Sequence, residues 1–108
     1  MGLFDFFKTP DINAGLQRFR TAPGALLVDV READEYANGH IPGSMNLPLS
    51  ALDTAEISIP RRDTPLFVYC LAGTRSAQAV SRLQRMGYTR VENIGGIRGY
   101  RGETERLK

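Results

Sequence analysis

The segment from Leu66 to Val80 constrains the fold of this chain more than any other. Its first five residues, Leu66 to Cys70, are apolar and β-prone, so they predict a buried strand. From Ser76 onward the apolar residues have helical spacing, and a short loop with Gly73 near its centre separates strand from helix. A strand that enters a tight loop and then a helix directs backbone N–H groups, together with the positive end of the helix dipole, at one point. Such a point favours an anionic group.

Cys70 lies at that point. It is the only cysteine of the chain and it begins the loop, which Arg75 ends. Cysteines at helix N-termini or beside cations have a pKa of roughly 3.5–7.5, against about 8.5 for a free thiol. A lone cysteine at a strand end can also be no more than a small buried hydrophobic residue. The glycine, the arginine and the helix that follow favour a reactive thiolate, with an anion held above it.

Strands and helices are predicted to alternate along the rest of the chain. The continuous apolar run 25–30 predicts a buried central strand, and shorter strands are predicted within 45–48 and over 88–94. Helices are predicted from Thr9, as N-cap, to about Phe19, over 31–37, and from Ser76 to Met86. This alternation is typical of an α/β domain with a mostly parallel sheet covered on both faces. In such sheets ligands bind beyond the carboxyl ends of the strands, where Cys70 is expected.

The composition indicates one soluble globular domain. The chain has 108 residues, 42% of them hydrophobic and 24% charged, which suits a single modest core. We therefore take 1–108 as one domain, with residues 1–8 as an apolar N-terminal extension. A net charge of +2 is too small to argue for nucleic acid, and no apolar run reaches membrane-spanning length.

The cysteine and histidine content narrows the chemistry further. One cysteine cannot form an internal disulfide, and with a single histidine it supplies no metal-ligand spacing, so we expect no metal site. A free thiol that takes part in chemistry fits a reducing compartment, and we expect the protein to be cytoplasmic.

Four landmarks, in the expected order, resemble the rhodanese family. They are the segment Leu27–Arg31 with Glu35–Tyr36, the segment Gly39–Ser44 with Asn46, the loop from Tyr69–Cys70 to Arg75–Ala77, and Gly87–Tyr88 with Val91–Gly96. Together they span the chain from about Ile12 to about Tyr100. The resemblance implies a rhodanese-like α/β fold, with a central, mostly parallel sheet of about five strands flanked by helices on both faces.

The resemblance also implies sulfur transfer. Cys70 would attack the outer sulfur of a small anionic donor such as thiosulfate, or of a persulfide, and become a persulfide itself. An acceptor such as cyanide or a thiol would then remove that sulfur, without any metal or organic cofactor. Backbone N–H groups of the loop would stabilise the persulfide, and Arg75 would attract the anionic donor. The expected substrate-binding residues are Leu71, Ala72, Gly73, Thr74 and Arg75.

Three further residues are expected to support the site. Asp29 and Arg31 could touch it directly, but we expect them to pair and to hold the loops beneath it. Ser76 is expected mainly to cap its helix, which is compatible with donating to the sulfur. His40 could be proposed as a general base, but we expect a structural histidine bonded to backbone in the turn 39–43.

Two alternative functions stay open. Protein phosphatases and arsenate reductases of related fold also place a cysteine loop before a helix, but their loop is one residue longer than the four residues between Cys70 and Arg75. A shorter loop is a narrower cradle, which suits a single sulfur atom better than a phosphoryl group. The second alternative is a module that relays sulfur between protein partners through Cys70, or that only docks.

Overall fold

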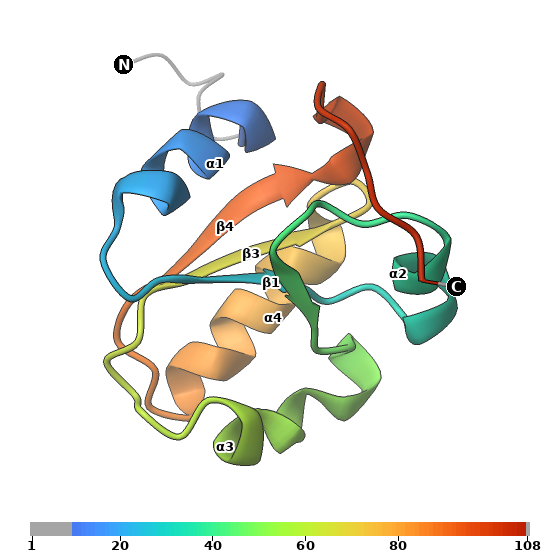
Figure 1. Ribbon diagram of the computed structural model, residues 1–108. Coiled ribbons are helices and arrows are strands. Elements are labelled where there is room, and N and C mark those ends of the chain that lie inside the picture. Colours follow the sequence, from blue (N-terminus) through green and yellow to red (C-terminus); the bar gives the residue numbers. More distant parts are fainter. Residues whose placement is uncertain (1–9, 108) are drawn as a thin grey trace, which may run out of the picture.

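Four parallel strands form the centre of the structure, a computed structural model that describes residues 10–107 (Figure 1). The expected N-terminal extension, residues 1–8, lies outside the described residues. In chain order the elements are α1 (Ile12–Thr21), β1 (Leu26–Asp29), α2 (Ala33–Asn38), β2 (Ser44–Asn46), the 3-10 helix η2 (Leu49–Thr54), α3 (Ala55–Ser58), β3 (Leu66–Cys70), α4 (Thr74–Arg85), β4 (Val91–Gly96) and the 3-10 helix η3 (Ile97–Gly99).

The strand order is β2-β1-β3-β4, and every neighbouring pair is parallel. The two continuous apolar runs, β1 and β3, occupy the centre, where both faces of a strand are buried. The expectation of about five strands is wrong for the described residues, which form four. The weakly patterned stretch between β2 and β3 forms η2 and α3, so it adds no strand to the sheet.

Helices cover both faces of the sheet, as expected (Figure 1). Because side chains alternate along a strand, β3 sends Leu66, Val68 and Cys70 to one face and Phe67 and Tyr69 to the other. The first set packs with residues of α4, η2 and α3, and the second packs with α1. Two apolar layers therefore hold β3 rigidly between them, and Cys70 is the last residue of that strand.

Several element boundaries differ from the predicted ones. Helix α1 has Asp11 as its N-cap, whose side chain accepts a hydrogen bond from the Asn13 N–H, while Thr9 lies outside the described residues. Helix α4 begins at Thr74. Strand β4 begins at Val91, because the Tyr88 side chain is buried and its hydroxyl donates to the carbonyls of Ala55 and Ile59.

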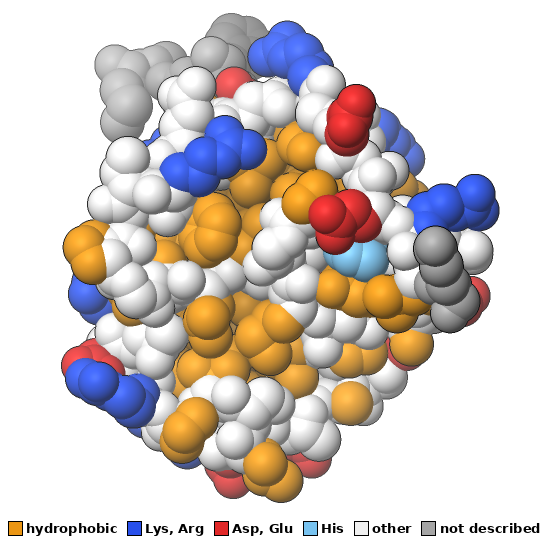
Figure 2. Space-filling view, viewed as in Figure 1, with side chains coloured by type: hydrophobic (Ala, Val, Ile, Leu, Met, Phe, Trp, Pro, Cys, Tyr) orange, Lys and Arg blue, Asp and Glu red, His pale blue; other side chains and the backbone are white. Residues whose placement is uncertain are grey.

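Figure 2 shows the face of the molecule seen in Figure 1. Hydrophobic side chains gather across its middle, between α1 and α3, and the Lys and Arg side chains lie mostly around its rim. Within residues 10–107, no helix is long and apolar enough to cross a membrane.

Candidate active site

The Cys70 side chain lies inside the loop that joins β3 to α4. The residue is 1% exposed, and its Sγ accepts a hydrogen bond from the Gly73 N–H at 3.0 Å. Gly73 is the N-cap of α4 and has a φ of 103°, a left-handed conformation that glycine adopts without steric cost. This turn brings the start of the helix over the sulfur, as the strand–loop–helix pattern predicted.

Hydrogen bonds lower the pKa of the Cys70 thiol below its ordinary value. Burial alone raises it, but the Ser76 hydroxyl and the N–H groups of Ser76, Gly73 and Ala72 stabilise the thiolate by more. The Ser76 Oγ lies 3.4 Å from Sγ. All of these groups are neutral donors, and the Arg75 guanidinium also interacts electrostatically with Cys70.

Ser76 does not cap α4, contrary to expectation. The N-cap is Gly73, and Ser76 lies in the first turn with its side chain turned inward and fully buried. Its hydroxyl is within hydrogen-bond distance of the Gly73 carbonyl at 3.0 Å and of Asn93 Oδ1 at 2.7 Å. The Asn93 amide in turn donates to the Gly73 carbonyl at 3.3 Å. Strand β4 therefore holds the loop through Asn93, a contact that the sequence analysis did not anticipate.

Gly96 supports the loop from the β4 side. It pairs with Cys70 across the sheet, and a Cβ placed on it would lie 2.2 Å from the Leu71 carbonyl oxygen and 2.6 Å from the Ala72 Cα. That oxygen also accepts a hydrogen bond from the Arg98 N–H. The loop backbone thus packs directly on the β4 backbone, which only glycine permits at this position.

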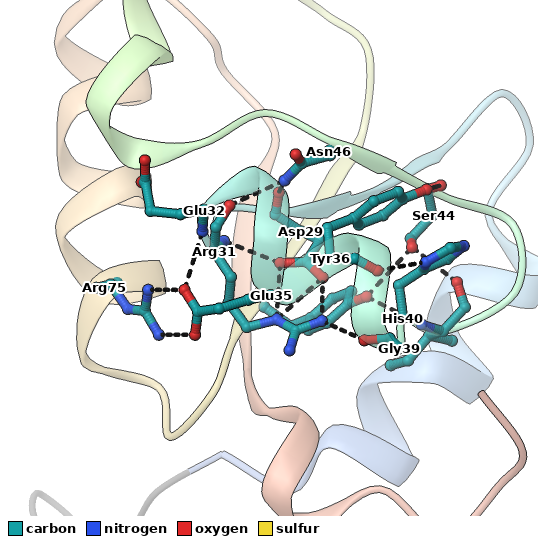
Figure 3. Close-up of polar contacts among 12 residues, drawn as sticks. Asp29, Arg31, Glu32, Glu35, Tyr36, Gly39, His40, Ser44, Asn46 and Arg75 are labelled. Carbon is teal, nitrogen blue, oxygen red and sulfur yellow. Dashed lines mark hydrogen bonds and ion pairs between the residues drawn. The ribbon is translucent and has the colours of Figure 1, made fainter. Parts of the chain in front are cut away.

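Arg75 pairs with Glu35 of α2 (Figure 3). Its Nη1 and Nη2 donate to the two oxygens of that carboxylate at 2.6 and 3.0 Å, a bidentate pair. The Arg75 hydrogen bonds lower the pKa of Glu35 to about 2. The same carboxylate accepts the Glu32 N–H and so completes the capping box of α2. The structure thus joins Arg75 to α2, a contact that the sequence analysis did not consider.

Asp29 and Arg31 pair beneath the site, as expected (Figure 3). They are 0% and 6% exposed, and Arg31 Nη2 lies 2.7 Å from Asp29 Oδ2. Arg31 also donates to the Gly39 carbonyl, and the Asn46 amide donates to the carbonyls of Asp29 and Arg31. The pair ties the carboxyl end of β1 to the turn after α2 and to β2.

His40 is held by hydrogen bonds to backbone groups. Its Nδ1 lies 2.8 Å from the Tyr36 carbonyl and its ring stacks on the Tyr36 ring. Its backbone exchanges two hydrogen bonds with Glu105 of the C-terminal segment. Within the part of the chain that the structure describes, no group of three or more His, Cys, Asp or Glu side chains could hold a metal ion.

The outer residues of the loop meet solvent. Leu71 is 40% exposed, and Ala72 and Thr74 are exposed. Beside Ala72 a shallow pocket of about 320 Å³ lies between the start of α1 and η3. Its lining includes the exposed charged residues Asp11 and Arg98. Cys70 is not among the residues that line this pocket.

The structure brings most of the predicted site residues together, and it adds two. Cys70, Gly73 and Ser76 meet at the sulfur, whereas Arg75, Asp29 and Arg31 form ion pairs around it. Glu35 and Asn93 are functional candidates that sequence reasoning missed. A signal existed for Asn93, because it is a polar residue at the carboxyl end of the predicted strand 88–94, close to the two glycines.

The structure is an α/β domain with a cysteine loop. Its parallel sheet carries a buried cysteine at the carboxyl end of a central strand, where N–H groups surround the sulfur. Comparison with known proteins identifies the family of this domain. The family model of the Rhodanese-like domain matches residues 13–103, so the chain belongs to this family.

Individual relatives agree with this assignment. Thiosulfate sulfurtransferase PspE of Escherichia coli is 39% identical over 72 residues, which cover 66% of this chain and 69% of PspE. The putative sulfur carrier protein YrkF of Bacillus subtilis is 32% identical over 80 residues, 73% of this chain and 43% of YrkF. A solved structure described as rhodanese with anions, from E. coli, superposes with a TM-score of 0.70 at 34% identity, over 76% of this chain and 98% of that one.

Proposed function

We propose that this protein is a sulfurtransferase that carries sulfane sulfur as a persulfide on Cys70. The donor is thiosulfate or a persulfide, and the acceptor is cyanide or a thiol. The observation that carries the proposal is the Cys70 sulfur at the centre of a loop whose N–H groups and Ser76 hydroxyl lower its thiol pKa. The relative PspE is named a thiosulfate sulfurtransferase, which supports the same reaction.

The proposed reaction has two steps. The Cys70 thiolate attacks the outer sulfur of the donor, the donor's S–S bond breaks, and its electron pair leaves with sulfite or a thiolate. The acceptor then attacks the outer sulfur of the Cys70 persulfide, and the thiolate is regenerated. The donors that hold the thiolate, namely the N–H groups of Ala72 and Gly73 and the Ser76 hydroxyl, would also stabilise a persulfide anion. The proposal needs no general base, which agrees with the structural role of His40.

A relay between proteins is the second candidate. It is favoured by Leu71, which follows Cys70 and exposes 40% of a large apolar side chain at the loop surface. An apolar contact beside the sulfur would suit a protein partner better than a small anion. The relative YrkF is named a putative sulfur carrier protein, which supports this reading. A free thiol with this role fits a reducing compartment, and we propose the cytoplasm.

Mass spectrometry of the intact protein tests the proposal. Wild-type protein treated with thiosulfate, or with a low-molecular-weight persulfide, should gain one sulfur atom of about 32 Da on Cys70, and cyanide should remove it. Cys70→Ala should gain none. A wild-type protein that stays unmodified with both donors would refute the sulfurtransferase proposal. The relay requires in addition that a persulfidated protein loads Cys70 faster than thiosulfate does, and equal or slower loading would exclude it.

A further inference from the structure

The charges around the Cys70 loop are arranged in opposite pairs. Arg75, the cation closest in sequence to the loop, has both Nη atoms bonded to Glu35. Arg31 donates to the Asp29 carboxylate through its Nε and Nη2. Figure 3 shows both pairs on the α2 side of the site.

Further charged residues lie at the start of α2 and beside Ala72. Glu32 adds a further carboxylate at the start of α2, next to Glu35. On the other side of the loop, the shallow pocket beside Ala72 has one cation, Arg98, and one carboxylate, Asp11. The pocket beside Ala72 therefore carries one side chain of each charge.

We propose that Glu35 is a specificity-determining positioning residue: by holding Arg75, it makes persulfides the preferred sulfur donors of Cys70, and thiosulfate a poor one. This inference rests on the sulfurtransferase function proposed above. Glu35 acts through Arg75, since its carboxylate offsets the guanidinium charge and takes one N–H of each Nη, the end-on fork that could otherwise hold an oxyanion. Arg75 then links α4 to α2 through this ion pair.

The chemistry of the two donors explains why this pairing matters. Attack on thiosulfate brings a thiolate against a dianion, and the negative charge leaves as sulfite when the S–S bond breaks. Attack on a hydropersulfide, RSSH, forms the same bond to Cys70 Sγ and breaks the same type of S–S bond, but the electron pair leaves as a thiolate, RS⁻. The proton of the outer sulfur stays on the Cys70 persulfide or passes to that thiolate. The first reaction therefore needs an unpaired cation far more than the second.

The Glu35→Gln variant separates these donors. Glutamine is accepted at the third helical position of a capping box, so α2 should keep its start, while the negative charge is lost. Glu92→Gln is the matched control, because Glu92 forms a comparable ion pair with Arg18 of α1 without contact to the loop. The second-order rate of Cys70 persulfidation is measured by mass spectrometry for wild type and both variants. The two donors are thiosulfate and 2-hydroxyethyl persulfide, whose side group is uncharged.

The Glu35→Gln variant should raise the thiosulfate rate constant about fivefold, which corresponds to about 1 kcal/mol, and change the persulfide rate constant by less than about twofold. Glu92→Gln should change neither. The gain with thiosulfate should shrink as ionic strength rises, because salt screens the freed guanidinium.

The outcomes separate this inference from the function on which it rests. Wild-type protein that gains sulfur from neither donor contradicts the sulfurtransferase function and the role of Glu35 with it. If Cys70 is loaded but Glu35→Gln changes both donors alike, Glu35 is only structural and the inference is wrong. A slower reaction of Glu35→Gln with thiosulfate alone would also overturn it, because Arg75 would then serve thiosulfate best in the position where Glu35 holds it.

Discussion

Removing the Ser76 hydroxyl should raise the pKa of Cys70. The hydroxyl lies 3.4 Å from Sγ, and it is the only side chain among the hydrogen-bonding groups that lower this pKa. A hydrogen bond to a charged group contributes about 1.5–3 kcal/mol, and since this one is long and its single proton is shared with Asn93 Oδ1, we take the lower end, which is about one pKa unit. In Ser76→Ala the thiolate loses this donor but keeps the backbone N–H groups, so the pKa should rise by about one unit.

The pH dependence of Cys70 alkylation by iodoacetamide, followed by mass spectrometry, reports this pKa directly. Below the pKa, the Ser76→Ala variant should react about tenfold more slowly than wild type, with the same limiting rate at high pH. Ser81→Ala is the matched control, because Ser81 is an exposed residue of the same helix. An unchanged pKa in Ser76→Ala would refute the reasoning: the hydroxyl would then keep its proton on Asn93 Oδ1, and the N–H groups alone would hold the thiolate.

Three other perturbations test the supports of the site. Gly96→Ala should leave the protein folded by circular dichroism but slow Cys70 loading about a hundredfold, since the new Cβ would displace the Leu71 carbonyl and with it the loop; normal loading would contradict the backbone packing described here. Asp29→Asn leaves Arg31 buried without its counter-ion, so urea unfolding should show a loss of about 3–5 kcal/mol. Because the folded-state pKa of Glu35 is about 2, below its ordinary 4.5, the stability due to this pair is complete above pH 4.5 and is lost as pH falls towards 2. Solvent screening limits this loss to about 1 kcal/mol, and Glu35→Gln should lack it.

The sequence predicts the fold correctly in the segments whose structure is determined by burial of a continuous apolar run. The runs 25–30 and 66–70 are apolar without alternation, which only central strands of a covered parallel sheet require, and β1 and β3 are those strands. Prediction failed where tertiary contacts outweigh local pattern. The apolar residue Ile57, for example, lies in α3 and is 85% exposed, since Leu52, Ala55 and Ile59 fill the core there.

The site could be predicted only in part, for a physical reason. The position of Cys70 follows from local order, because strand, loop and helix are consecutive in sequence. The partners of the loop are not consecutive: Glu35 is 40 residues from Arg75, and Asn93 is 17 residues from Ser76. Whether Arg75 faces a substrate or a carboxylate depends on where α2 packs, which no spacing within the loop reveals.

The difference between local loop contacts and long-range ion pairs also bears on how the Cys70 thiolate is stabilised. A cation beside a thiolate attracts any anion, whereas N–H groups fixed by a helix start and by β4 are directed at one atom. The loop around Cys70 stabilises the thiolate mainly through directed N–H groups. The Gly73 N–H donates to Sγ at 3.0 Å, whereas Arg31 and Arg75 are both bonded to carboxylates. Such a cradle stabilises the thiolate and the persulfide alike, whichever donor supplied the sulfur. In the proposed reaction the choice of donor then depends on charges outside the cradle, so a change at Glu35 would alter specificity without altering the reactive atom.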